Sequence, residues 1–263
     1  MVGYCIQLRR FEQAFTITQD PLSESTSQRQ AGRVLVFIPT FNDSAALPDL
    51  LSEIADMGDR YRALVIDDGS SEPVLTRELM KQCLHAKLPA NFGLGVCTHI
   101  AFSHALRHGY QAIVRVDGDG QHRISDIVRL MQDIDAGTAD LVAGVRTNQS
   151  KDPGSLGRKI VKSYFSGFAR RITRGRAPQD VNTGFFAANT AALESLNRQT
   201  LERFPEPEMY VSACRANLRV GSVEVEQRDR DVGRSTLQLM GAFSMFFRFN
   251  VFVFGQFFRR RLP

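Results

Sequence analysis

The stretch Asp117-Gly118-Asp119-Gly120-Gln121-His122 directly follows an apolar run, Ala112-Ile113-Val114-Arg115-Val116. Such a run predicts a strand that is buried in a sheet. Two carboxylates one residue apart, at the end of a strand and separated by a glycine, can converge on one hard cation such as Mg²⁺ or Mn²⁺. Asp and Gly are also the residues that any chain uses to leave a strand, so the stretch taken alone is equally consistent with a turn.

Strands and helices alternate on both sides of this stretch. Apolar runs predict strands at 34–38, 63–66, 85–88, 112–116 and 141–143, another after 180–186, and one over 219–227. The segments between them predict helices at 46–57, 72–81, 94–108, 125–135, 156–172, 190–197 and 206–216. This alternation indicates an α/β fold with a doubly wound, mostly parallel sheet and helices on both faces. Ligands of such sheets bind at the carboxyl ends of the strands, where the 117–122 loop is expected.

The two ends of the chain differ from this central domain, which we place at 33–236. Residues 1–32 end in a polar tract and are expected to form an N-terminal extension. Residues 237–263 hold eight of the 19 Phe and end in Arg259-Arg260-Arg261. The apolar part is long enough to span a bilayer, but Arg248 at its middle would cost about 2.5–3.5 kcal/mol there. We therefore expect this segment to lie at a membrane interface, the alternatives being packing on the core or a homo-oligomer contact.

Charge and cysteine content narrow the class of protein. The net charge is only +5, but the chain carries no acid between Asp152 and Asp180, where seven of its Lys and Arg lie. Such a basic stretch suits phosphates, nucleic acid or an anionic membrane surface, to which a peripheral protein could bind. The four Cys are far apart and lack metal-type spacing, and no signal peptide is apparent, so we expect a cytoplasmic protein.

Several motifs, taken in order over about 34–236, resemble those of family-2 glycosyltransferases of the GT-A fold. The branch they are most similar to is that of dolichyl-phosphate mannosyltransferase. The motifs are Ile38-Pro39-Thr40-Phe41-Asn42, Val65-Ile66-Asp67-Asp68-Gly69-Ser70, Asn91-Phe92-Gly93-Leu94-Gly95, the 117–122 stretch, 180–185, Glu206-Pro207-Glu208 and 230–235. Phe41 stands where the family often has Tyr, which leaves the identity of the donor open.

The resemblance implies an inverting transfer from a nucleoside-diphosphate sugar. By analogy with the family, the residues that bind the donor would be Pro39, Thr40 and Asn42 around the base, Asp68 at the base edge, and Asp117 at the ribose or the metal. Those that hold Mg²⁺ or Mn²⁺ on the diphosphate would be Asp119 and Gln121, with Asp117 as a further ligand. Arg230 and Arg234 would clamp phosphates, because a guanidinium matches phosphate geometry with two hydrogen bonds.

The general base is a separate question. Transfer to a hydroxyl requires a base near the acceptor, for which Asp180 is the first candidate and Glu208 the second. An acceptor that is itself a lipid phosphate is already a nucleophilic anion and needs little base. Asp180 could instead cap a turn, and Glu208 could simply favour the start of a helix. His122 is equally consistent with a site residue and with a polar residue at a helix entry.

The sequence thus predicts a metal-dependent glycosyltransferase at the cytoplasmic face of a membrane, acting on a polyprenyl phosphate or a lipid-linked glycan. A sugar nucleotidyltransferase is a first alternative, but the loop after the first strand lacks the Gly-rich, basic pattern expected of one. A non-catalytic subunit that binds nucleotide or an assembly partner is a second alternative. Nucleic acid is not an expected partner, because aromatic residues that could stack on bases are not interleaved with the basic stretch.

Overall fold

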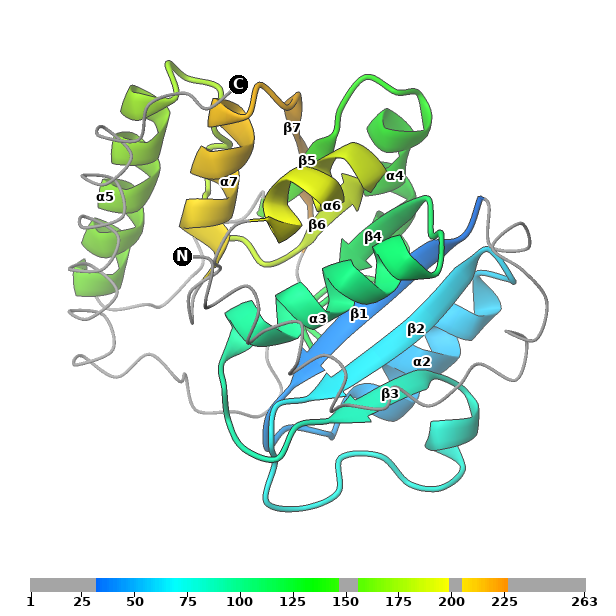
Figure 1. Cartoon of the computed structure of the whole chain (residues 1–263). Helices are drawn as coiled ribbons and strands as arrows, with labels where there is room; N and C mark the ends of the chain where they lie inside the picture. Colours follow the sequence, from blue (N-terminus) through cyan, green and yellow to red (C-terminus); the bar gives the residue numbers. More distant parts are fainter. Residues whose placement is uncertain (1–31, 147–155, 199–204, 227–263) are drawn as a thin grey trace.

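The computed structural model describes residues 32–146, 156–198 and 205–226 (Figure 1). Strands and helices alternate through most of this length, as the sequence predicts. The strands are β1 (Val34–Thr40), β2 (Tyr61–Asp67), β3 (Leu84–Lys87), β4 (Ala112–Arg115), β5 (Leu141–Arg146), β6 (Phe186–Asn189) and β7 (Val220–Val225). The helices are α2 (Leu47–Asp56), α3 (Leu94–Arg107), α4 (Asp126–Asp135), α5 (Leu156–Ile172), α6 (Thr190–Asn197) and α7 (Glu206–Arg215), with a 3₁₀ turn, η2 (Leu79–Lys81).

The seven described strands form one sheet in the order β3-β2-β1-β4-β6-β5-β7. The pairs β1–β2, β2–β3, β1–β4 and β5–β7 are parallel, whereas β6 runs antiparallel to both of its neighbours, β4 and β5. All strands except β6 therefore point the same way, and their carboxyl ends share one edge. The prediction of a mostly parallel α/β sheet is confirmed.

Helices cover both faces of the sheet, and β1 shows why its sequence is apolar throughout. Leu35 and Phe37 belong to the core cluster shared with α3, α5, α6 and α7. Val34, Val36 and Ile38 belong to the cluster on the other face, under α2 and α4. Successive side chains of a strand point to opposite faces, so a strand covered on both sides needs no polar position. Figure 1 shows α3 and α6 in front of the sheet and α2 behind it.

The prediction of a helix at 72–81 is wrong. Only η2, three residues long, is helical there. The apolar residues of the segment make only a partial buried face: Leu75 is buried, Val74 and Leu79 are half-buried against the same core cluster, and Met80 is 38% exposed. A short helix in water needs a full buried face, because its backbone hydrogen bonds alone barely offset the entropy of ordering it.

No helix within the described ranges is long and apolar enough to cross a membrane. The segments assigned to 1–31 and 227–263, including the proposed membrane-interface and homo-oligomer segment 237–263, lie outside the described residues.

His104 of α3 is buried in the core. Its ring lies 4.2 Å from that of His108, centroid to centroid. Burial, then the neighbouring His108 and Arg107, lower the pKa of His104 to about 3. A neutral imidazole is therefore part of the packed structure.

We expect this histidine to make folding sensitive to acid. The folded-state pKa lies below the unfolded value of about 6.5, so its contribution is fully present above that pH and is lost as the pH falls toward 3. The free energy of unfolding, measured in urea between pH 7 and 5, should fall by about 1.4 kcal/mol per pH unit from this group below pH 6.5. In His104→Gln the decline should be shallower, and an identical decline would contradict the assignment.

Gly69 lies where the loop after β2 packs against the loop after β3, at the carboxyl edge of the sheet. Substituting it measures how tightly these loops pack. It has φ +78°, and a Cβ there would lie 2.3 Å from the carbonyl carbon of Ala90. Gly137 has a similar φ of +65°, but nothing within 4 Å of a Cβ. Gly137→Ala should cost about 1 kcal/mol in urea unfolding from backbone strain alone, and Gly69→Ala about 3 kcal/mol from strain and clash together. Equal losses would show that the loops can move apart.

Candidate active site at the carboxyl edge of the sheet

The loops after β1 and β2 are tied together by Asn42. The backbone N–H of Asn42 donates to Ser70 Oγ at 2.8 Å, and its Oδ1 accepts from the N–H of Ser71 at 3.0 Å. The φ of Asn42 is +51°, a left-handed conformation that Asn tolerates better than most residues. The predicted base-pocket residues Pro39 and Thr40 end β1 immediately before this junction. The structure thus gives Asn42 a definite loop-to-loop role.

Asp68 connects the same region to the start of α3. One carboxylate oxygen accepts from the N–H of Phe92 at 2.8 Å, and the other from the N–H of Gly93 at 2.9 Å. These are the kind of donors that a helix N-terminus leaves unsatisfied. Asp68 is buried, so its carboxylate holds the 91–93 loop in place beside the loops after β1 and β2.

The 117–122 loop lies against the end of β1. A Cβ on Gly118 would lie 3.2 Å from Pro39 O, and one on Gly120 would lie 2.8 Å from Ala46 Cβ. Asp119 Oδ1 accepts from the N–H of Gln121 at 3.1 Å. The structure therefore brings the predicted base-pocket and metal residues to one edge, as their positions after parallel strands imply.

A buried arginine organises the interior side of this loop. Arg115, the last residue of β4, has a side chain only 4% exposed. Its Nη2 donates to Asp117 Oδ1 at 2.7 Å, and its Nη1 donates to Glu206 Oε1, also at 2.7 Å. Gly184 packs directly on the pair, since a Cβ there would lie 2.5 Å from Arg115 Nη2. One guanidinium thus joins the 117–122 loop to the first residue of α7.

These contacts keep Asp117 ionised. Burial alone would raise the pKa of its carboxyl, but the Arg115 guanidinium and His122 outweigh burial and hold that pKa well below its usual range. The side chain is still 35% exposed. Asp117 therefore presents a permanent negative charge at the rim of the site.

His122 is packed against Asp117 and Phe185 beside the candidate site. Its side chain is buried, its Nε2 lies 3.3 Å from Asp117 Oδ2, and its ring stacks on Phe185 at 4.6 Å. Within the described residues its Nδ1 has no hydrogen-bond partner. Both carboxylate oxygens of Asp117 consequently have a protein partner.

The two candidate bases lie on the same side of the molecule as this network. Asp180 is buried, and its Oδ1 accepts from the backbone N–H of Asn182 at 2.9 Å. Tyr210 is fully buried and donates to Thr183 O at 3.2 Å. Burial, then nearby Glu206, raises the pKa of this phenol, and Asp180 and Asp117 act in the same direction. Glu208 is buried in the first turn of α7.

The donor set at this edge suits Mg²⁺ or Mn²⁺. The loop offers two carboxylates, Asp117 and Asp119, and the amide of Gln121, all of them hard oxygen ligands. Among the described residues no group of three or more His, Cys, Asp or Glu could hold a metal. Mg²⁺ is commonly held in this incomplete way, by one or two carboxylates with the substrate's phosphates and water supplying the rest.

Arg230 and Arg234, the predicted phosphate clamps, lie outside the described residues.

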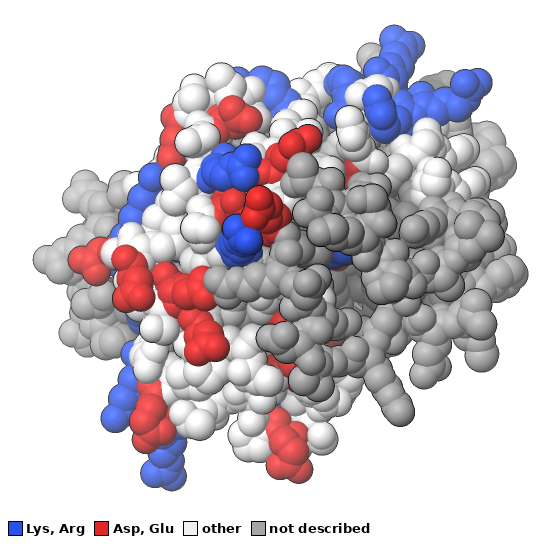
Figure 2. Space-filling view, turned by 180° about the vertical axis from the view of Figure 1, so that it is seen from behind, with Lys and Arg blue, Asp and Glu red and all other residues white. Residues whose placement is uncertain are grey.

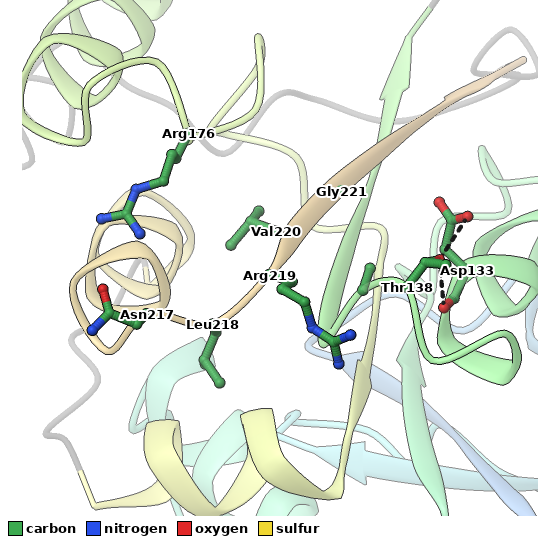
Figure 3. Close-up of a pocket in the computed structure, with 9 residues that line it drawn as sticks. Asp133, Thr138, Arg176, Asn217, Leu218, Arg219, Val220 and Gly221 are labelled. Atoms are coloured by element: carbon green, nitrogen blue, oxygen red, sulfur yellow. Dashed lines mark hydrogen bonds between the residues drawn. The ribbon is translucent and has the colours of Figure 1, made fainter.

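A separate hollow lies at the opposite edge of the sheet, at the amino end of β7 (Figure 3). Its volume of about 460 Å³ would suit a small ligand. Its most prominent cation is already engaged, because Arg219 donates to Asp140 Oδ1 at 2.7 Å and Oδ2 at 3.0 Å, and to Gly137 O. This edge carries none of the predicted site residues, so we assign the chemistry to the carboxyl edge.

Comparison with known proteins agrees with this geometry. The model of glycosyl transferase family 2 matches residues 35–197, more than half of the chain. The chain belongs to this family. It is therefore a glycosyltransferase, which confirms the resemblance seen in the motifs and removes the main support for a nucleotidyltransferase.

Relatives of this glycosyltransferase are found by sequence and by structure. It is 29% identical over 197 residues to a polyprenol monophosphomannose synthase of Mycolicibacterium smegmatis, covering 70% of each chain. It is 27% identical to an undecaprenyl-phosphate mannosyltransferase of Micrococcus luteus, covering 78% of this chain and 87% of that one. Its fold matches glucosyl-3-phosphoglycerate synthase of Mycobacterium tuberculosis, solved with Mn²⁺ and UDP-glucose, with a TM-score of 0.65 at 15% identity over 87% and 82% of the chains.

Sequence reasoning missed the role of Arg115 and gave Glu206 no partner. A signal was present, because Arg115 is a charged residue within an otherwise apolar strand. An arginine buried in a sheet needs a carboxylate partner. The partner could not be found from spacing, since Glu206 lies 91 residues further along the chain.

Gly184 offers a test of how closely the network is packed. Gly184→Ala would push a methyl group into Arg115 and Asp117, and breaking a buried ion pair costs about 3 kcal/mol or more. In Gly221→Ala, the control, the nearest atom would be Ala139 Cβ at 3.5 Å, an ordinary contact. Urea unfolding should show a loss of about 3 kcal/mol for Gly184→Ala and less than about 1 kcal/mol for the control. Similar small losses for both would mean that the network is loosely packed.

Proposed function

We propose that this glycosyltransferase moves a sugar from a nucleoside-diphosphate sugar to a polyprenyl phosphate, with inversion at the transferred carbon and with bound Mg²⁺ or Mn²⁺. The observation that carries the proposal is the Asp117–Gln121 loop, which lies against the end of β1 beside Pro39. Two named relatives act on polyprenol or undecaprenyl phosphate, which supports this acceptor class over a lipid-linked glycan.

The chain's own residues have distinct tasks in this reaction. Pro39, Thr40 and Asn42 would line the base pocket, on loops that the Asn42 hydrogen bonds hold together. Asp68 would lie at the edge of the nucleotide base. It also holds the 91–93 loop in position. Asp117, Asp119 and Gln121 would hold the cation. When bound, the cation would neutralise charge that builds on the departing nucleoside diphosphate.

The roles of the buried acids Asp180 and Glu208 depend on the chemistry of the acceptor. A phosphate oxygen is already anionic and can attack the sugar carbon without losing a proton. Asp180 would then orient an acceptor or sugar group instead of acting as a general base, and Glu208 would have no proton to remove. If the acceptor were a hydroxyl of a lipid-linked glycan, Asp180 would be the first candidate for the base.

A membrane-bound substrate also implies contact with a membrane surface. Arg170, Arg171 and Arg174 are exposed at the C-terminal end of α5 and in the turn after it. Figure 2 shows Lys and Arg side chains gathered at the upper right, on the side of the molecule where α5 lies. Each such side chain near an anionic bilayer contributes about 1 kcal/mol of attraction, which supports peripheral association at the cytoplasmic face. Arg230 and Arg234 remain proposed phosphate ligands.

The function is tested by supplying the full chain with a panel of nucleotide sugars, Mn²⁺ and undecaprenyl phosphate in detergent. One donor should be consumed with formation of a polyprenyl-phosphate sugar, and EDTA should stop the reaction. Asp119→Asn should lower the rate of sugar transfer at least about 100-fold, because it removes the charge of one proposed metal ligand. The free energy of unfolding in urea should be nearly unchanged, because the residue lies in a loop at the edge of the sheet. Asp133→Asn, at the opposite edge, is the matched control.

If no donor is consumed, or if Asp119→Asn transfers sugar as fast as the wild type, the proposal fails. A non-catalytic nucleotide-binding subunit would instead bind nucleotide equally well in both forms and transfer nothing.

A further inference from the structure

The loop that would bind a divalent cation has a permanent positive charge next to it. Arg115 Nη2 lies 2.7 Å from Asp117 Oδ1, and a guanidinium cannot lose its proton inside a protein. Because the side chain is only 4% exposed, water screens this charge poorly. Arg115 on its own would therefore repel a cation at Asp117 and cancel much of that carboxylate's charge.

Glu206 supplies the charge that compensates for this. Its Oε1 accepts from Arg115 Nη1 at 2.7 Å, and its side chain is 10% exposed. The guanidinium thus carries a carboxylate on each of its two terminal nitrogens. The set of Arg115, Asp117 and Glu206 has a net charge of −1, whereas Arg115 and Asp117 alone would be neutral.

Glu206 belongs to α7 and not to the 117–122 loop. Glu206 is the first residue of α7, lies between Pro205 and Pro207, and is buried. A carboxylate in a first helical turn is favourable by itself. The compensating charge therefore comes from a different element of the fold than the 117–122 loop.

We propose that Glu206 is a charge-compensating positioning residue: it neutralises Arg115, so that Arg115 can orient Asp117 without removing the loop's attraction for a divalent cation. This inference rests on the proposed function, because it assumes that the loop binds Mg²⁺ or Mn²⁺. Its consequence is that removing the charge of Glu206 should weaken metal binding, and that removing Arg115 as well should restore it.

A double-mutant cycle tests this dependence. Mn²⁺ binding to the full chain is measured from the free-ion EPR signal for the wild type, Glu206→Gln, Arg115→Met and the double variant. Gln keeps an oxygen that can accept from Arg115 but lacks the charge. Glu206→Gln, which leaves the set neutral, should weaken Mn²⁺ binding at least about tenfold, and the double variant, whose net charge is again −1, should bind Mn²⁺ within about threefold of the wild type. No loss in Glu206→Gln, or a double variant that binds as weakly as Glu206→Gln, overturns the proposal.

A second comparison needs no change at Arg115 and guards against a misfolded double variant. Glu206→Asp restores the charge at a shorter reach, so it should bind Mn²⁺ within about threefold of the wild type. If Glu206→Asp is as weak as Glu206→Gln, charge is not what matters and the proposal is wrong. Asp140→Asn, which removes a carboxylate from the ion pair with Arg219 at the other edge of the sheet, should leave Mn²⁺ binding unchanged.

Sugar transfer measured in parallel separates this inference from the proposed function. A wild-type chain that transfers sugar while Glu206→Gln binds Mn²⁺ normally would overturn only the role of Glu206. A wild-type chain that neither binds Mn²⁺ nor transfers sugar would overturn both.

Discussion

The buried guanidinium of Arg115 connects two segments of this glycosyltransferase that are far apart in the chain. Arg115 leaves the sheet at the end of β4 and bonds to Asp117 in the following loop and to Glu206 at the start of α7. Breaking one partner of a buried ion pair costs several kcal/mol, because the other charge is left without compensation. The 117–122 loop and α7 are therefore held in one arrangement, which a mobile surface salt bridge could not do.

The sheet makes this arrangement possible through its one reversed strand. β6 lies between β4 and β5 and runs antiparallel to both. The chain therefore reaches the carboxyl edge just before β6 begins, which brings Thr183, Gly184 and Phe185 beside the 117–122 loop. Thr183 Oγ1 donates to Gly144 O at 2.7 Å, and Phe185 stacks on His122. A strand in the common parallel orientation would begin at the opposite edge and leave this side of the site open.

The loops that follow β1, β2 and β3 are held by polar side chains and close backbone contacts. Asn42, Ser70 and Asp68 hydrogen-bond to backbone or side-chain groups of neighbouring loops, and Gly69 approaches the Ala90 backbone too closely for any side chain. Such loops are placed by a rigid scaffold, and their geometry is set before a ligand arrives. Asn42 and Asp68 thus have structural partners as well as proposed ligand roles, and substitution at either position would affect both.

The sequence by itself determined the α/β class, nearly all of the strands and helices and the family, and it placed the candidate site residues at one edge of the sheet. It did so because apolar periodicity reports burial, and because loops after parallel strands meet at one edge. It failed at 72–81, where the apolar residues are only partly buried and three residues alone are helical. Only the tertiary structure decided that His122 packs against Asp117 and Phe185 and that Arg115 and Glu206 are partners. Those facts depend on contacts between residues far apart in the chain, and local pattern carries no information on which distant carboxylate will neutralise a buried charge.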